Sequence, residues 1–159
     1  MNERGFTLVE TIVAVSVIGI LSAVAMPMLA LGMRTARLDY EAARMATELR
    51  YLREMTMNYM PVHSDFEGIT VSGATPFMRI KSNGYAINKG TVDIEGHKRE
   101  LPDFMSCRFV NTVTRWEIKF EHDGTVKPPA TVKMTGGDET RYIIVDSVGR
   151  VRVSKTPPQ

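Results

Sequence analysis

The chain has 159 residues, of which 43% are hydrophobic and 24% charged, the composition of an ordinary globular protein. This length suits one compact domain, or a smaller domain with an appendage, and the single cysteine, Cys107, excludes an intramolecular disulfide. The net charge of +2 is too small to indicate a strongly charged partner. Its distribution is uneven, however, because residues 141–159 contain four basic side chains and one acidic side chain, a net of +3.

An apolar segment, residues 6–33, follows a short polar stretch at the N-terminus. Glu10 is the only ionisable side chain in this segment. As a helix, its 28 residues would reach about 42 Å, which is enough to cross a hydrocarbon core about 30 Å thick. A carboxylate at membrane depth costs about 2.5–3.5 kcal/mol on insertion scales, so we expect Glu10 to have a function there.

An amphipathic helical pattern follows from Arg34 onward. No Gly or Pro occurs between Met33 and Pro61, so we expect one helix over residues 6–60 that ends before Pro61. Apolar residues recur along it at spacings of three and four, and this stripe should seat the helix on a folded domain. The stripe consists of Leu38, Ala42, Met45, Leu49, Leu52, Thr56 and Tyr59.

Charged residues, including Glu41 and Glu48, occupy the other side of this amphipathic segment, and we expect that side to face solvent. Opposite charges three or four residues apart on a helix lie close enough to attract each other. We therefore expect two such pairs, Glu41 with Arg44 and Arg50 with Glu54.

The sequence period falls to two after Pro61, which is typical of short strands. Ser82-Asn83-Gly84 predicts a hairpin, because Asn-Gly adopts positive φ at low cost. Short strands bounded by turn residues favour an antiparallel sheet with one face covered, here by the apolar stripe. We therefore expect an α+β fold in which a long N-terminal helix packs on an antiparallel sheet. The expected strands are residues 77–80, 85–88, 91–95, 105–110, 115–121, 130–135, 141–146 and 150–154.

Three interpretations of the N-terminal segment are open from the residues alone. A secretory signal peptide would use Ala23-Val24-Ala25 as its cleavage site, although the helical pattern continues past that point. A plain single-pass membrane anchor explains the length of the segment but gives Glu10 no function. A prepilin-type signal explains both the length and the glutamate.

The stretch "RGFTLVE" (residues 4–10), followed by "TIVAVSVIGILSAVAMP" (residues 11–27), resembles the N-terminus of type IV pilins and of the pseudopilins of type II secretion. The resemblance extends to residue 33. It implies that a membrane-embedded prepilin peptidase cuts after Gly5 and methylates the new amino terminus at Phe6. It also implies a single pass through the inner membrane, with the N-terminus in the cytoplasm and the C-terminal domain outside.

The resemblance gives Glu10 a partner. In that family the corresponding glutamate pairs with the N-terminal amine of a neighbouring subunit, and such a pair is strong in a low dielectric, whereas an unpaired member is costly. The alternative is a position for Glu10 near the lipid headgroups, where its carboxylate reaches water. Pro27 corresponds to a proline that bends or loosens the helix of pilins, because proline cannot donate the usual backbone hydrogen bond.

The strand-rich region is similar to minor pseudopilins of the FimT/GspH type in its strand order and its glycine-bounded hairpins. This favours a minor subunit of a type IV pilus, a competence pilus or a type II secretion pseudopilus. A major pilin stays open, although many major pilins carry a C-terminal disulfide loop that Cys107 alone cannot make. The implied partners are prepilin peptidase, the membrane and other pilin or pseudopilin subunits. The implied segments are a leader (1–5), a transmembrane and assembly helix (6–33), an amphipathic helical half (34–60) and a β-rich globular domain (61–159).

The stretch "GRVR" (residues 149–152) matches a Gly-Arg-X-Arg pattern that is associated with DNA uptake in FimT-like minor pilins. In a strand, Arg150 and Arg152 would project from one face, about 6.6–6.8 Å apart, while Val151 and Val153 face the core. The two guanidinium groups could then hold phosphates of double-stranded DNA without reading its sequence. The alternative is that both arginines only solvate the outer face of an edge strand, as in a GspH-type pseudopilin that acts in secretion without binding DNA.

No pattern in the sequence indicates catalysis. His63, His97 and His122 lack metal-ligand spacing, and no phosphate-binding glycine loop or nucleophile motif occurs. We expect Cys107 to behave as a small buried hydrophobic residue in a strand. The sequence therefore predicts a structural subunit with no enzymatic activity and no cofactor or metal.

Overall fold

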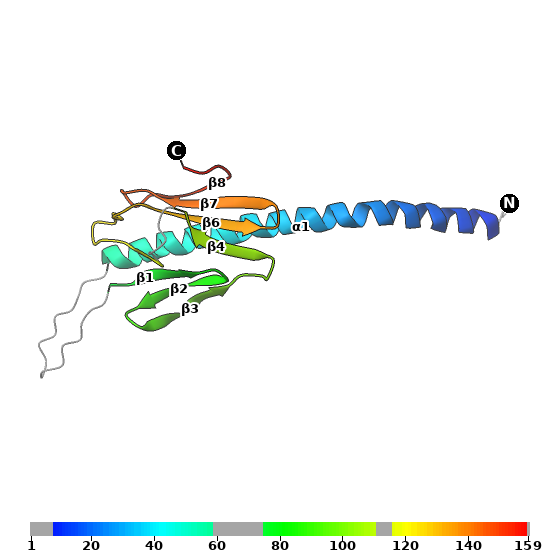
Figure 1. Ribbon diagram of the computed structural model, residues 1–159. Coiled ribbons are helices and arrows are strands. Elements are labelled where there is room, and N and C mark those ends of the chain that lie inside the picture. Colours follow the sequence, from blue (N-terminus) through cyan, green and yellow to red (C-terminus); the bar gives the residue numbers. More distant parts are fainter. Residues whose placement is uncertain (1–7, 59–74, 111–115, 159) are drawn as a thin grey trace, which may run out of the picture. The chain divides into compact units, whose positions relative to one another are not determined.

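A computed structural model describes residues 8–58, 75–110 and 116–158 of the chain (Figure 1). The chain divides into two compact units, residues 1–36 and 37–159. The helix α1 begins in the first unit and ends in the second, and all the strands belong to the second unit. The described elements are α1 (Leu8–Asn58), β1 (Phe77–Lys81), β2 (Gly84–Lys89), β3 (Val92–Glu100), β4 (Met105–Phe109), β5 (Glu117–Lys119), β6 (Ala130–Gly136), β7 (Glu139–Val145) and β8 (Val151–Ser154).

The long helix expected from the sequence is confirmed over the residues that the structure describes. α1 has 51 residues and continues through Pro27. Each expected strand overlaps one of the observed strands. The expectations for Tyr59 and for Pro61, as the residue that ends the helix, lie outside the described residues.

The apolar stripe of α1 is buried as expected. Its members between Leu38 and Thr56 are all inaccessible to solvent, and each large aliphatic side chain buried in this way contributes about 1.5–3 kcal/mol relative to exposure. Glu41 is also fully buried, so the expectation that it faces solvent is wrong. It lies at the margin of the stripe, where the helix meets a sheet, and forms an ion pair with Arg99 of β3.

Polar residues on both margins of the stripe attach the helix to the strands that it covers. On one margin, α1 contacts β3 through charged side chains. On the other margin, it contacts β7 and β8. These contacts are Glu41 with Arg99, Glu48 with His97 (2.7 Å), Asp39 with Arg141, and the Arg50 guanidinium, which donates to the Val151 carbonyl (3.1 Å).

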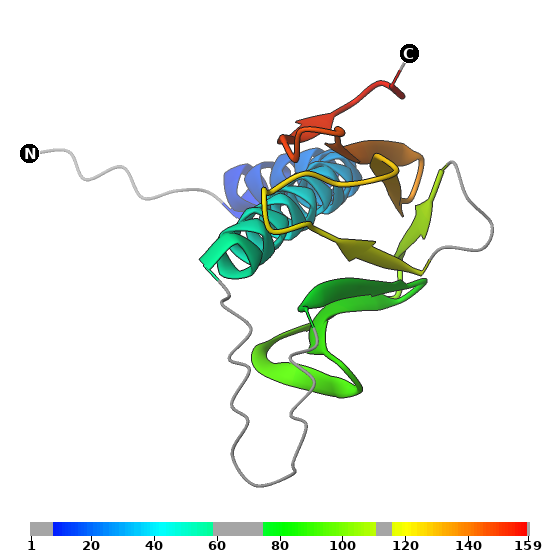
Figure 2. The same ribbon diagram turned by 90° about the vertical axis from the view of Figure 1, so that its left-hand side faces the viewer.

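The strands form two antiparallel sheets of four strands, where the sequence pattern predicted one. Their orders are β3-β2-β1-β5 and β4-β6-β7-β8. Figure 2 looks roughly along α1 and shows the strands of both sheets gathered around one side of its second half. An amphipathic helix can cover two adjacent sheets because its apolar stripe is broad and the two inner faces converge on it.

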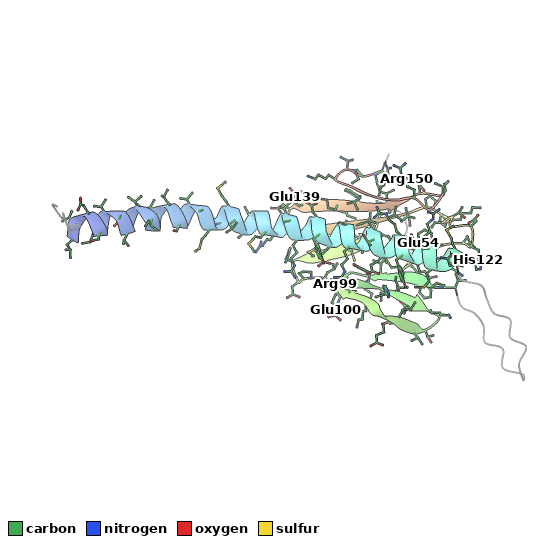
Figure 3. The ribbon with its side chains drawn as sticks, turned by 180° about the vertical axis from the view of Figure 1, so that it is seen from behind. Glu54, Arg99, Glu100, His122, Glu139 and Arg150 are labelled. Atoms are coloured by element: carbon green, nitrogen blue, oxygen red, sulfur yellow. The ribbon has the colours of Figure 1, made fainter. Side chains whose placement is uncertain are left out.

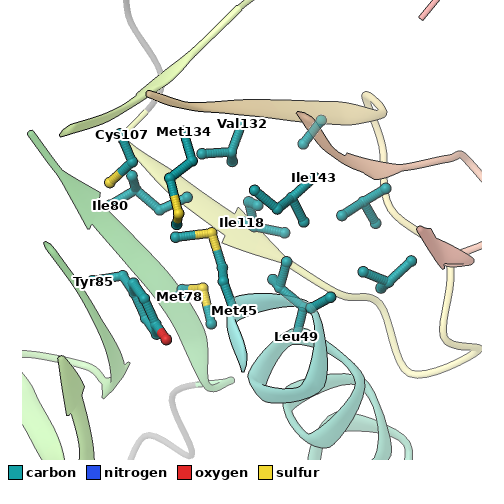
Figure 4. Close-up of a cluster of buried hydrophobic side chains, with 14 of the residues drawn as sticks. Met45, Leu49, Met78, Ile80, Tyr85, Cys107, Ile118, Val132, Met134 and Ile143 are labelled. Atoms are coloured by element: carbon teal, nitrogen blue, oxygen red, sulfur yellow. The ribbon is translucent and has the colours of Figure 1, made fainter. Parts of the chain in front are cut away.

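Cys107 of β4 joins the two sheets. Its backbone N–H donates to the Ser82 carbonyl in the β1–β2 turn (3.0 Å), and its thiol donates to the Lys81 carbonyl (2.9 Å). Figure 4 shows the continuous core that results, with Met45 and Leu49 of α1 facing side chains from both sheets. Among the described residues, every buried member of this core lies between Leu38 and Val151, so the unit 37–159 has a hydrophobic core of its own.

The hairpin predicted at Ser82-Asn83-Gly84 is confirmed, but Gly84 has a different function from the one expected. Lys81 pairs with Gly84, so Ser82 and Asn83 form the turn and Gly84 begins β2 without a positive φ. A Cβ on Gly84 would lie 2.2 Å from the Arg99 carbonyl oxygen. The glycine is therefore required by the close approach of β3 and not by the turn.

Candidate functional site in the N-terminal helix and at the C-terminal arginines

The first half of α1 is apolar, and its described residues in the unit 1–36 are not covered by another element. Every residue from Leu8 to Arg34 is exposed. By length and composition, α1 could cross a membrane. An apolar surface of this extent is stable only in lipid or against other apolar helices. Its large exposed side chains are Leu8, Val9, Ile12, Val13, Val15, Val17, Ile18, Ile20, Leu21, Val24, Met26, Met28, Leu29, Leu31 and Met33.

Two hydroxyl groups within this apolar half are satisfied by the helix itself, which suits an apolar environment. The hydroxyl groups of Thr11 and Ser16 donate to the carbonyls of Leu8 (2.8 Å) and Ile12 (2.7 Å), so the helix itself satisfies them. Glu10 lies in the first turn of α1 and its side chain is exposed. Gly5 and Phe6, the expected processing residues, lie outside the described residues.

The arginines of "GRVR" have different backbone environments. β8 begins at Val151, so the expectation that Arg150 lies in the strand is wrong. Arg150 belongs to the β7–β8 turn, where its backbone N–H donates to Asp146 Oδ1 (2.8 Å). Arg152 lies in β8, and both arginine side chains are exposed.

The valines of the same stretch also differ from each other. Val151 is buried as expected. Val153 pairs with the buried Ile143 and therefore projects from the same face of the sheet as Val151, but it is 40% exposed. β8 pairs only with β7 and is an edge strand of its sheet, which explains why its second valine is only partly covered.

Arg150 lines a surface hollow together with two arginines of α1 that are distant from it in sequence. This arginine hollow is bounded by α1 on one side and by the β7–β8 turn on the other. Arg152 lines a separate hollow with Ile144, Ser154, Thr156, Pro157 and Pro158. The residues of the arginine hollow are Arg50, Arg53, Glu54, Val148, Gly149, Arg150 and Val151.

The backbone around the arginine hollow is tightly packed. Gly149 has a φ of +77°, and a Cβ there would lie 1.8 Å from the Gly124 carbonyl oxygen. The Arg53 Nε donates to this same carbonyl (3.1 Å). The glycine of "GRVR" is therefore required by the turn conformation and by the contact with the β5–β6 connection.

No cluster of three His, Cys, Asp or Glu side chains that could hold a metal ion occurs in residues 8–58, 75–110 and 116–158. His97 contacts the Glu48 carboxylate through its Nδ1 and stacks on Tyr51, with ring centroids 4.7 Å apart. Burial raises the pKa of the Cys107 thiol to about 12, which makes it a poor nucleophile at neutral pH. His63 lies outside the described residues.

Comparisons with known proteins agree with the N-terminal motif and with the fold. The prokaryotic N-terminal methylation motif matches residues 1–26. The fold is similar to that of the type IV minor pilin FimU of Pseudomonas aeruginosa, with a TM-score of 0.55 and 13% identity, over 76% of this chain and 90% of that chain. A second crystal form of FimU gives a TM-score of 0.52, over 73% and 91% of the two chains.

A pseudopilin structure is similar to the same extent. The minor pseudopilin EpsH, from the type 2 secretion system of Vibrio cholerae, has a TM-score of 0.52 and 16% identity, over 74% of this chain and 96% of that chain. No curated protein matches the sequence significantly. The chain therefore combines a prokaryotic N-terminal methylation motif with a fold similar to that of a type IV minor pilin and of a minor pseudopilin.

Proposed function

We propose that the chain is a minor subunit of a type IV pilus or of a secretion pseudopilus, stored in the inner membrane and then assembled through α1. The observation that carries this proposal is the contrast within one helix. Its second half packs against the hydrophobic core of the unit 37–159, while its first half is exposed and largely apolar, with Glu10 as the single ionisable side chain between Leu8 and Met33. A plain anchor would need the apolar length but not the carboxylate.

In this proposal, prepilin peptidase cuts after Gly5 and methylates Phe6, with the N-terminus in the cytoplasm. Cutting creates an amine four residues before Glu10. In the filament, the amine of one subunit and the Glu10 carboxylate of its neighbour neutralise each other between packed apolar helices. Pro27 lies in the same helical half and lets it loosen as the helices pack.

Processing is tested by coexpression of the full chain with a prepilin peptidase, followed by mass spectrometry. The mature protein should lack residues 1–5 and carry an N-methylated Phe6. Gly5→Leu should remain uncut, because a bulky side chain then occupies the cleavage position. A mature chain that begins at Met26 would identify a secretory signal peptide and refute the proposal.

Assembly is tested with Glu10→Ala, compared with Ser16→Ala as a matched change in the same apolar half. Glu10→Ala should still be processed and inserted, because it removes a charge from membrane depth. It should fail to enter filaments, since the neighbouring amine would lose its partner at a cost of several kcal/mol. Ser16→Ala should assemble normally. Equal incorporation of both variants would exclude an intersubunit pair at Glu10.

A second candidate function is non-specific binding of double-stranded DNA through Arg150 and Arg152. It is favoured by the exposure of both side chains and by the additional arginines beside Arg150. A secretion pseudopilin that binds no DNA is the alternative. Duplex binding by the wild type that is largely lost in the double variant Arg150→Gln/Arg152→Gln, but retained in Lys155→Gln, would separate this motif from the general charge of the tail.

A further inference from the structure

The arginine hollow contains more positive charge than "GRVR" alone supplies. Arg50, Arg53 and Arg150 surround it, against the single carboxylate of Glu54 on its wall. Figure 3 shows Glu54 on α1 and Arg150 on the β7–β8 turn. The Asp146 carboxylate is also nearby, because it accepts a hydrogen bond from the Arg150 backbone N–H.

The two helix arginines are held in place by backbone carbonyls. Arg50 Nη2 donates to the Val151 carbonyl (3.1 Å), and Arg53 Nε donates to the Gly124 carbonyl (3.1 Å). A guanidinium group has five N–H donors, so each of these arginines retains donors beyond the one that anchors it. Anchoring reduces the side-chain entropy that a bound anion must overcome, which favours binding.

The donor chemistry of the hollow suits phosphate. Planar guanidinium groups bind phosphate oxygens in pairs, with charge-assisted hydrogen bonds. The hollow lies on the surface of the unit 37–159, and Arg50 and Arg150 on its rim are exposed. A phosphate carried by a chain could therefore enter while its neighbours remain outside, and the contact would fix position without reading sequence.

We propose that the arginine hollow takes a phosphate group of the nucleic-acid backbone, so that the DNA-binding surface extends from "GRVR" onto Arg50 and Arg53 of α1. This proposal rests on the DNA-binding candidate function above. It assigns Arg50 and Arg53 a function in binding in addition to their attachment of the helix to the strands. It also assigns Glu54 an opposing effect, since its carboxylate repels the phosphate.

Glu54→Gln is the decisive variant, because it changes the charge of the hollow and leaves both arginine anchors intact. Binding of a fluorescein-labelled 30-base-pair duplex is measured by anisotropy with the full chain in neutral detergent micelles, at several salt concentrations. At low salt, Glu54→Gln should bind about two- to fivefold more tightly, the effect of removing one nearby charge in a high dielectric. Glu95→Gln, an exposed change of the same charge on β3, is the control and should have a smaller effect.

Arg50→Gln and Arg53→Gln test the same surface in the opposite direction. Each should weaken duplex binding and lower the log–log salt slope by about one, the loss of one phosphate contact. Thermal unfolding of each variant shows whether the fold is retained. Where an arginine variant does not fold, Glu54→Gln decides alone.

The outcomes separate this inference from the function on which it rests. Tighter binding by Glu54→Gln than by Glu95→Gln supports the arginine hollow. Equal effects of these two variants overturn the arginine-hollow proposal. DNA binding through "GRVR" would still hold in that case if Arg152→Gln weakens duplex binding. Absence of duplex binding by the wild type at any salt concentration refutes both proposals, and leaves Arg50 and Arg53 as attachments of the helix alone.

Discussion

Glu41 of α1 and Arg99 of β3 form an ion pair in which the Glu41 side chain is fully buried and the Arg99 side chain is 29% exposed. The Arg99 Nε lies 3.1 Å from Glu41 Oε2, and a second donor of the same guanidinium reaches the other carboxylate oxygen. The hydrogen bond to the Glu41 carboxylate raises the pKa of Arg99. The Arg99 guanidinium therefore stays charged throughout the physiological range, and the pair attaches the helix to the sheet that contains β3.

The two partners should not be equally costly to remove. Arg99→Gln leaves a charge in a site closed to water, and we expect a loss of about 3–5 kcal/mol in the free energy of unfolding. Glu41→Gln leaves Arg99 able to reach water, so its cost should be smaller. Glu100→Gln, a surface change beside Lys98, should cost less than about 1 kcal/mol. Urea denaturation of residues 37–159 measures all three, and a larger loss for Glu41→Gln than for Arg99→Gln would contradict the burial asymmetry.

The positions of the helix and strands could be predicted because local periodicity determines them. The stripe from Leu38 to Thr56 follows a helical period. The strands show a period of two and are separated by turns that contain glycine or proline. The division into two sheets could not be predicted, since strand pairing is long-range and β1 and β5 pair across many residues. The burial of Glu41 could not be predicted for a similar reason: its partner Arg99 is distant in sequence, whereas the expected partner Arg44 is its neighbour on the same helix.

The candidate site shows the same limit. Glu10 could be identified from the sequence because a lone carboxylate in an apolar run is a local anomaly. Arg50 and Arg53 could not be connected to Arg150, since only the packing of α1 against the β7–β8 turn brings them together. The glycine of "GRVR" was read as part of a DNA-binding pattern, whereas its contact with Gly124 gives it a structural function.

Gly149→Ala should destabilise the fold more than Gly137→Ala. Both glycines have positive φ, +77° and +65°, so either alanine incurs about 1–3 kcal/mol of backbone strain. Only at Gly149 would the new Cβ also meet the Gly124 carbonyl, at 1.8 Å, whereas it would meet nothing within 4 Å at Gly137. Chemical denaturation of the two variants gives the comparison. Equal losses in the free energy of unfolding would show that the backbone near Gly124 moves away from the new Cβ at little cost.

Asp39→Asn should reduce stability at neutral pH and have little effect in acid. The Arg141 hydrogen bond holds the pKa of Asp39 below its usual value of 3.8, so the stabilisation is present above that value and is lost as pH falls through the lower, folded-state pKa. Asp39 is half exposed and Arg141 keeps Glu139 (2.9 Å), so the loss at pH 7 should be about 1 kcal/mol or less. A deficit that persists undiminished at pH 2 would contradict this explanation, and Asp103→Asn is the exposed control.

Cys107 should report the opening of the joint between the two sheets. Its thiol is buried, and burial raises its pKa to about 12, so the thiol is almost entirely protonated at pH 8. Alkylation by iodoacetamide in native buffer should therefore be slow and limited by unfolding.

Because Cys107 contacts Ser82 and Lys81 across the joint, exposure of the thiol requires the sheets to separate. The free energy of opening obtained from the alkylation rate should equal that from urea denaturation of residues 37–159, and should fall in parallel in Arg99→Gln and Gly149→Ala. Rapid alkylation of the folded protein, with no change in its urea midpoint, would show instead that the sheets separate locally and that the shared core does not unfold as one unit.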